Sequence, residues 1–171
     1  PFNFDPPHVP AENPVGVYRR SFEAKKGERT YIVFEGVSSY FEVKVNGKYV
    51  GMSKGSHLQS EFDLTEFVVE GENELVVSVY KWCDGSYLED QDFFRFSGIF
   101  RDVYLLRRPT EHLTDFYIHT HESGNVWIDT EYTCGRLDTN FTIYDPDGNR
   151  VDTMNVGEPI LWTAETPRLY T

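Results

Sequence analysis

The sequence predicts an all-β protein made of antiparallel strands. Apolar and polar residues alternate with a period of two at 40–46, 74–82 and 125–133, which is typical of strands with one buried and one exposed face. Turn signals separate these runs, and Asn46-Gly47 is the clearest, because both residue types accept the positive φ of a tight hairpin. No amphipathic stretch of three helical turns is present. Strands in this number, with long connections, favour a two-sheet sandwich over a small barrel.

The elements follow one another in a simple order. The first 14 residues contain five prolines, so we expect them to run extended over a surface. Residues 64–67 are expected to form one short helical turn, and 83–98 a long irregular connection. Strands are predicted at 16–24, 29–37, 40–46, 48–53, 74–82 and 99–107.

A second domain is predicted after the sequence Arg107-Arg108-Pro109. New strands are expected at 113–120, 125–133 and 138–145, and each ends in a turn signal such as Asp147-Gly148. This pattern is that of an immunoglobulin-type sandwich, which normally uses ~100 residues, whereas roughly 60 remain here. We therefore expect domains at 1–108 and 109–171, the second of them incomplete, and a chain that is a piece of a longer protein.

Composition limits the partners of the chain. Its formal net charge is −12, which argues against nucleic acid or an anionic membrane as a ligand. No apolar run approaches the roughly 20 residues of a membrane span, and no secretion signal is recognised, so a cytoplasmic location is predicted. Cys83 and Cys134 form no disulfide framework. Neutral ligands and metal cations remain open.

The segment 82–102 has the strongest chemical character in the chain. It combines several aromatic rings with four carboxylates: Asp84, Glu89, Asp90 and Asp92. Three interpretations are open: a solvated loop capped by core aromatics, a support for sugar hydroxyls, or a site for a hard cation such as Na⁺, Mg²⁺ or Ca²⁺. Hydrolysis of a glycoside needs two carboxyls about 5–10 Å apart across a cleft, and this segment alone supplies no cleft.

Other charged residues give weaker signals. Arg95 and Arg101 lie between aromatics and acids, and each is expected to pair with a neighbouring acid or to stack on a ring. His119 and His121 lie two residues apart on a predicted strand, but a metal site would need a third ligand that the sequence does not supply.

Six segments resemble, in the same order, the N-terminal part of bacterial β-galactosidases of glycoside hydrolase family 2. The most specific is 84–102, which ends Ser-Gly-Ile-Phe-Arg-Asp, and another contains Glu12-Asn13-Pro14. The complete set is 6–16, 34–37, 45–51, 60–64, 84–102 and 161–170. The chain departs from the family pattern near Met154–Pro159, where another strand pair is expected, so we expect residues of the parent protein to be missing there.

The resemblance implies a jelly-roll (galactose-binding-like) β-sandwich in 1–108, followed by a partial immunoglobulin-like β-sandwich. In this family a TIM barrel carries two catalytic glutamates and hydrolyses terminal β-D-galactosides such as lactose with retention. That barrel lies outside this chain, which is therefore expected to be inactive alone. The remainder of the same protein is an expected partner, and a homo-oligomer is expected for the whole enzyme.

The resemblance also assigns roles to single residues. Asn13 and Asp92 are expected at the rim of the sugar pocket, and Asp92 is also expected to help hold Na⁺. Asp84 is the expected ligand of a structural Mg²⁺, while Glu89 and Asp90 are expected to be loop scaffolding. Two other functions remain possible: a self-sufficient carbohydrate-binding module, or a domain that serves tetramer assembly.

Overall fold

The computed structural model describes residues 5–89, 92, 94 and 96–171. The predicted all-β class is confirmed, because the described residues form strands and a single 3-10 turn, η1 (Asp84–Tyr87). The chain divides into two compact units, Pro1–Thr110 and Glu111–Thr171, two residues from the predicted boundary at 108/109. No helical segment in the described part of the chain has the length and hydrophobicity needed to span a bilayer.

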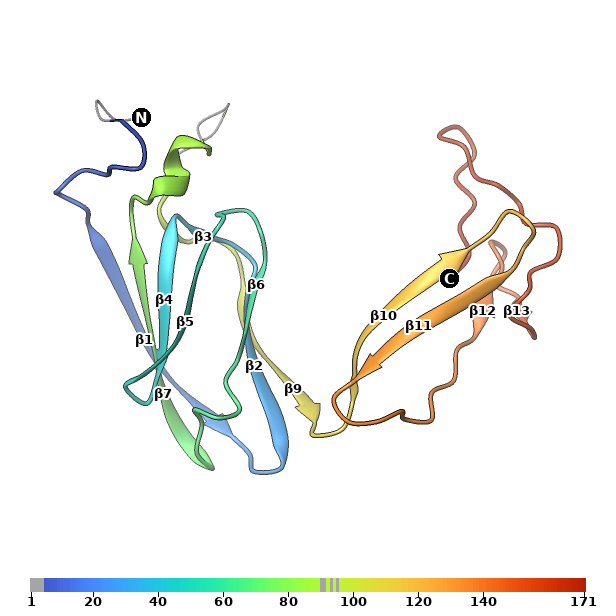
Figure 1. The fold of residues 1–171 in the computed structure, drawn as a ribbon, viewed down its shortest axis with the longest axis horizontal. Helices are drawn as coiled ribbons and strands as arrows, with labels where there is room; N and C mark the ends of the chain where they lie inside the picture. The colour runs from blue at the N-terminus through green and yellow to red at the C-terminus, as the bar shows by residue number, and fades with distance from the viewer. Residues whose placement is uncertain (1–4, 90–91, 93, 95) are drawn as a thin grey trace. The chain divides into compact units, whose positions relative to one another are not determined.

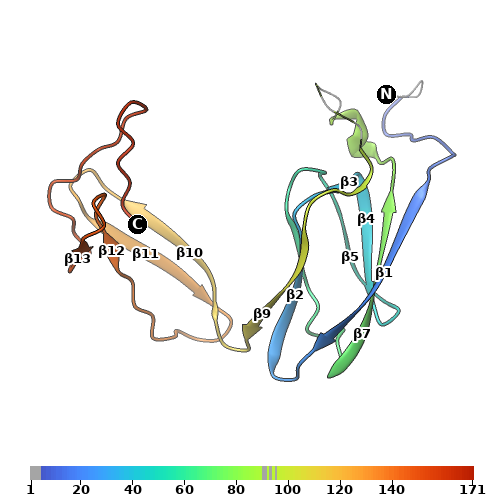
Figure 2. The same ribbon diagram turned by 180° about the vertical axis from the view of Figure 1, so that it is seen from behind.

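The first unit is a sandwich of two antiparallel sheets, seen as facing layers in Figures 1 and 2. One sheet has the order β1-β7-β4-β5 and contains β1 (Val15–Ala24), β7 (Gly71–Tyr80), β4 (Tyr40–Val45) and β5 (Lys48–Lys54). The other has the order β6-β2-β9 and contains β6 (Ser60–Asp63), β2 (Glu28–Phe34) and β9 (Val103–Pro109). A short pair, β3 (Val37–Ser38) with β8 (Gly98–Ile99), lies outside both sheets.

The core of this unit lies between the two sheets. The Phe34 ring from β2 packs on Phe41 from β4, with 4.8 Å between ring centroids, and both side chains are buried. The sandwich is closed tightly between β5 and β6, because atoms of the Phe62 ring lie 3.0 Å from where a Cβ on Gly51 would stand. A larger residue at position 51 would displace that ring. The buried cluster is Ile32, Phe34, Val37, Phe41, Val43, Val45, Leu64, Val77 and Val79.

Local polar contacts explain where the predicted elements differ from those observed. The turn expected at 64–67 forms, with the Phe67 amide donating to the Leu64 carbonyl at 2.8 Å. The strand predicted at 138–145 is confined to β12 (Ile143–Tyr144). Before it, the Thr139 hydroxyl lies 2.7 Å from the Tyr132 hydroxyl, so this stretch contacts β11 through side chains instead of a backbone ladder.

The second unit consists of two hairpins. In the first, β10 (Leu113–Thr120) pairs with β11 (Val126–Tyr132), and in the second, β12 pairs with β13 (Arg150–Val151). Asp145 closes the second hairpin, since its carboxylate accepts the backbone amides of Asp147 and Asn149 at 2.9 and 2.8 Å. These short sheets leave large apolar side chains exposed: Phe116, Tyr117, Ile118 and Trp127.

Candidate functional site

The acidic loop, residues 83–98, begins where β7 ends, at the same end of the sandwich as the start of β1 (Figure 1). Asn13, in the segment before β1, holds the beginning of the acidic loop in place. Its side-chain amide nitrogen donates to the Trp82 carbonyl, and its side-chain oxygen accepts the Trp82 amide, both at 2.9 Å. The side chain of Asn13 therefore acts like one residue of an additional strand, and it places residues 9–13 against the loop.

Glu89 fixes the middle of the loop. One carboxylate oxygen accepts the Ser56 backbone amide and the other accepts the Ser56 hydroxyl, both at 2.7 Å. Ser56 is fully buried in the connection between β5 and β6. Hydrogen bonds from a buried donor to a charged acceptor are stronger than those between neutral groups. Glu89 therefore ties the loop to a segment 33 residues earlier in the chain.

A further contact ties the loop to the N-terminal segment. The Tyr87 hydroxyl donates to the backbone carbonyl of His8. Burial raises the pKa of Tyr87, and the nearby Asp5 carboxylate raises it further, so the phenol stays protonated and able to donate. Three separate contacts thus hold the first half of the loop.

Asp84 pairs with a lysine on β5. Both carboxylate oxygens of Asp84 lie 2.8 Å from the Lys54 ammonium, and one also accepts the Gly85 amide. The hydrogen bond from Lys54 is the main cause that lowers the pKa of Asp84 below its usual 3.8. The hydrogen bond from the Gly85 amide lowers this pKa further. Both side chains are close to half exposed, so solvent screens the pair.

We expect Asp84→Asn to reduce the free energy of unfolding at pH 7 by less than about 1 kcal/mol. Because the pKa is lowered in the folded state, the contribution is present above pH 3.8 and is lost as the pH falls through the folded-state pKa. Urea titrations of both proteins at pH 7 and near pH 2 test this. A difference that persists unchanged at low pH would contradict the ion pair.

The tip of the described loop is exposed. Asp92 has a φ of 44°, a left-handed conformation that aspartate tolerates better than most residues. Its carboxylate makes no hydrogen bond or ion pair with any described residue. The residues Leu88, Phe94 and Phe96 are 88%, 83% and 66% exposed, so the described residues of the tip present apolar side chains beside the Asp92 carboxylate.

The structure separates the predicted site residues into two groups. Asp84 and Glu89 are paired with Lys54 and Ser56, whereas the Asp92 carboxylate has no partner among the described residues. Asp90 and Arg95 lie outside the described residues. Arg101 was expected to pair with an acid or to stack on a ring. It donates to the Glu35 and His57 carbonyls at 3.3 and 3.2 Å, and its guanidinium lies over the Phe100 ring.

The two histidines do not come together as a ligand pair. His119 contacts the Asp129 carboxylate at 2.7 Å, while the ring of His121 contacts the Ser123 hydroxyl at 2.8 Å.

The described residues contain no cluster of three or more His, Cys, Asp or Glu side chains that could hold a metal. Asp84 does not fit a magnesium site, because the Lys54 ammonium occupies both of its oxygens. Asp92 fits better as a single oxygen ligand of a hard cation, since its carboxylate is exposed and unpaired within the described part. Any further ligands would have to come from elsewhere in the parent protein.

The anchors of the loop were not predicted from the sequence. Ser56 and Lys54 lie 33 and 30 residues from the acids that they contact. Nothing in a local pattern reports such pairings. Because Ser56 follows the end of β5 by two residues, the sequence could only have indicated that Ser56 lies at the same end of the sandwich as the loop.

The sequence profile of "Glycosyl hydrolases family 2, sugar binding domain" matches residues 1–109. The chain therefore belongs to glycoside hydrolase family 2. Among its relatives are β-galactosidases from Actinobacillus pleuropneumoniae (44% identity) and Staphylococcus xylosus (42% identity). Each match covers all of this chain but only 18% and 19% of the respective relative. The first alignment runs over 184 positions, 13 more than the 171 residues here, so that relative carries residues that this chain lacks.

Solved structures agree with this assignment. A β-glucuronidase 2 from Bacteroides uniformis matches with a TM-score of 0.76 and 26% identity over 91% of this chain and 23% of its own. A β-glucuronidase from an uncultured Clostridium matches with a TM-score of 0.69 and 28% identity over 90% of this chain and 31% of its own. The chain thus spans about a fifth to a third of the proteins that it resembles.

Proposed function

We propose that the parent protein is a retaining β-galactosidase and that this chain supplies one wall of its sugar pocket. The β-galactosidases that align with the whole chain support the substrate class. The observation that carries the proposal is Asp92, an exposed carboxylate without a described partner on a loop whose base is fixed. Such a group has hydrogen-bonding capacity that a sugar hydroxyl can use.

The base of the acidic loop is fixed to the rest of the sandwich, which favours a defined position for Asp92. Its base is tied by Asn13, Glu89 and Tyr87, and the exposed apolar side chains at its tip are typical of a surface that another part of a protein covers. Fixed side chains lose less entropy when they bind, which favours a precise contact to one hydroxyl. The remainder of the parent protein would contribute the nucleophile and the general acid of a retaining reaction.

Within this proposal Asp92 has two tasks. Its carboxylate accepts a hydrogen bond from a galactose hydroxyl, and it contributes one oxygen to a bound Na⁺. A sodium ion at this position supplies a positive charge that orients hydroxyl oxygens of the sugar. Asn13 contributes to the pocket rim by positioning the segment before β1. A cytoplasmic location and a homo-oligomeric parent enzyme remain part of the proposal.

The test is made in the parent enzyme with a chromogenic β-galactoside. Losing one charged hydrogen bond costs about 1.5–3 kcal/mol, so Asp92→Asn should lower kcat/KM by roughly 10- to 100-fold and weaken the dependence on sodium. Asp84→Asn removes the same charge from the same loop at a residue already paired with Lys54, and it should change kcat/KM by less than about twofold. Equal kinetics in both variants would show that Asp92 does not contact the substrate.

The alternative of a self-sufficient sugar-binding module makes a different prediction for the 171-residue chain. A cavity at this loop, between Ser39, Trp82 and Phe96, has a volume of about 10 Å³, which is too small for a sugar ring. Calorimetric titration with galactose should therefore show millimolar binding at best. Binding at tens of micromolar would favour the module.

A further inference from the structure

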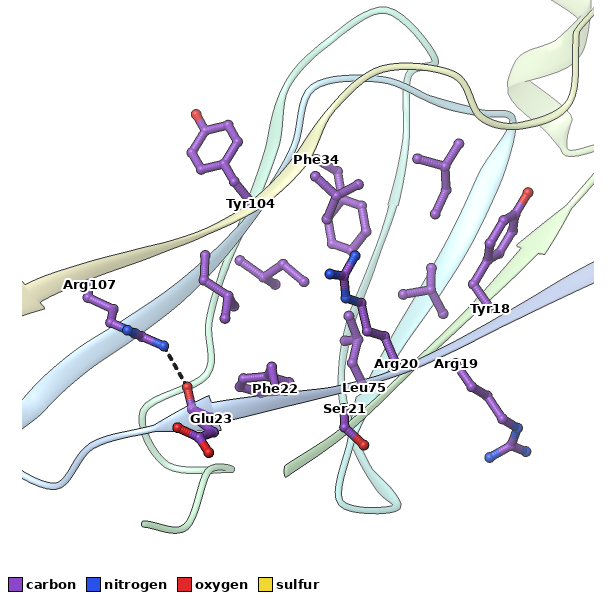
Figure 3. A pocket seen from close by; sticks show the side chains of 15 residues that line it. Tyr18, Arg19, Arg20, Ser21, Phe22, Glu23, Phe34, Leu75, Tyr104 and Arg107 are labelled. Atoms are coloured by element: carbon purple, nitrogen blue, oxygen red, sulfur yellow. Dashed lines mark hydrogen bonds between the residues drawn. The ribbon is translucent and has the colours of Figure 1, made fainter. Parts of the chain in front are cut away.

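The first unit contains an open cleft between β1 and β9, with a volume of about 650 Å³ (Figure 3). Its floor is apolar and comes from the inner faces of both sheets, with Phe22 from β1, Phe34 from β2, Leu75 from β7 and Leu105 from β9. The described lining residues belong to β1, β2, β7, β8 and β9, so the cleft is separate from the tip that carries Asp92. An open apolar cleft of this size in a sandwich core marks a binding surface.

Both strands that flank the cleft are edge strands. Of the described strands, β1 pairs only with β7 and β9 pairs only with β2. Each therefore presents backbone N–H and C=O groups that can accept another strand. The opposite side of the same sandwich is closed, because Phe62 of β6 packs against Gly51 of β5. The side of the sandwich between β1 and β9 thus lacks the close packing that joins β5 to β6.

Close approaches between side chain and backbone border the cleft at both ends. At one end the Arg107 guanidinium donates to the Glu23 carbonyl at 2.7 Å. At the other, the Tyr18 hydroxyl lies 2.6 Å from where a Cβ on Gly98 would stand. About five residues separate Tyr18 from Glu23, which is roughly 17 Å of strand. The opening is therefore elongated along β1 and has the length of an ordinary strand.

One charged side chain faces this apolar cleft without a described partner. The register pairs Arg20 with Leu75, which lines the floor, and Figure 3 shows Arg20 reaching over the cleft from β1. Arg19 lies on the other face and pairs with Glu74. Arg20 is therefore able to pair with an acidic group from outside the described structure.

We propose that an extended segment of the parent polypeptide, from outside these 171 residues, binds in the cleft as an additional β-strand. Its alternate apolar side chains fill the cleft, its backbone pairs with the free edge of β1 or β9, and an acidic residue faces Arg20. The parent polypeptide is the source because the chain spans only about a fifth of its β-galactosidase relatives. A second copy is disfavoured, because antiparallel pairing of two β1 edges would bring Arg20 and Arg19 of both copies together.

Photocrosslinking in the full-length parent protein tests the occupant directly. A benzoylphenylalanine in place of Tyr18, which faces the cleft, should crosslink to a residue outside the 171-residue chain and within the same molecule. A matched probe at Tyr49, on the opposite side of the sandwich, should not reach that segment. Mixing isotopically labelled and unlabelled protein separates crosslinks within one molecule from those between copies. A crosslink to a second copy, or none to the parent chain, would overturn the proposal.

Hydrogen exchange with charge reversal tests the role of Arg20. Amides of β1 or β9 should exchange about tenfold or more slowly in the parent protein than in the 171-residue chain. Arg20→Glu should remove that protection, whereas Arg19→Glu, one residue away on the other face, should preserve it. If Arg20 only blocks aggregation at an edge strand, both variants will leave exchange in the parent unchanged, and the assignment fails.

Discussion

Replacing Phe34 with alanine is expected to destabilise the first unit by about 3–5 kcal/mol. The Phe34 side chain is fully buried and contacts the rings of Phe41 and Phe62, with centroids 4.8 and 6.0 Å away. Removing it leaves a void that these rings cannot fill without leaving their own contacts. Urea titration followed by hydrogen exchange of the buried β4 amides measures the loss.

The matched control is Phe94→Ala. Phe94 is 83% exposed, so the same substitution there should change stability by less than about 0.5 kcal/mol. A loss below about 1 kcal/mol for Phe34→Ala would mean that the cleft walls collapse into the void. That outcome would contradict the close packing of Phe34 against Phe41 and Phe62 described above.

The second large effect is expected at Glu89. Glu89→Ala removes both acceptors of the buried Ser56, leaving an unsatisfied amide and hydroxyl at a cost of about 1–3 kcal/mol. The expected result is local opening, because the hydrogen bonds join a loop to a connection and not one sheet to another. Amides of residues 83–89 should exchange up to roughly 100-fold faster, at about 1.4 kcal/mol for each factor of ten.

Two variants separate the hydrogen bonds of Glu89 from its charge. Glu89→Gln retains one acceptor and should show an intermediate effect. Glu61→Ala removes an exposed carboxylate from β6 and should leave loop exchange unchanged. Loop protection that survives Glu89→Ala would show that Asn13 and Tyr87 suffice to hold the loop.

The predictability of this fold from sequence follows the length and regularity of each strand. The strands β4 and β7 were predicted, at 40–46 and 74–82, because their alternation continues over many residues and their inner faces are apolar. β6 was missed because it spans only four residues and contains two acids and a serine. The stretch 138–142 was predicted as part of a strand at 138–145 that ends in a turn signal, but its backbone forms no ladder with another described strand.

The candidate site was predictable in composition but not in geometry. The sequence shows that 82–102 is rich in acids and aromatics, but not which acid is free. That distinction depends on Lys54 at the end of β5 and on Ser56 in the connection that follows it. The cleft could not be predicted from the sequence either. The inner face of β1 alternates through Tyr18, Arg20 and Phe22, which is a weaker apolar pattern than in central strands and indicates an incompletely covered face.

The short strand β8 belongs to two regions at once. Gly98 adopts a φ of 101°, and the Tyr18 hydroxyl occupies the space that a side chain at position 98 would need. Ile99 lines the cleft wall. The same two residues also end the acidic loop, six positions after Asp92. A side chain at position 98 would collide with the Tyr18 hydroxyl and would have to adopt a positive φ that favours glycine. One substitution there would therefore alter both an end of the cleft and the backbone that closes the acidic loop.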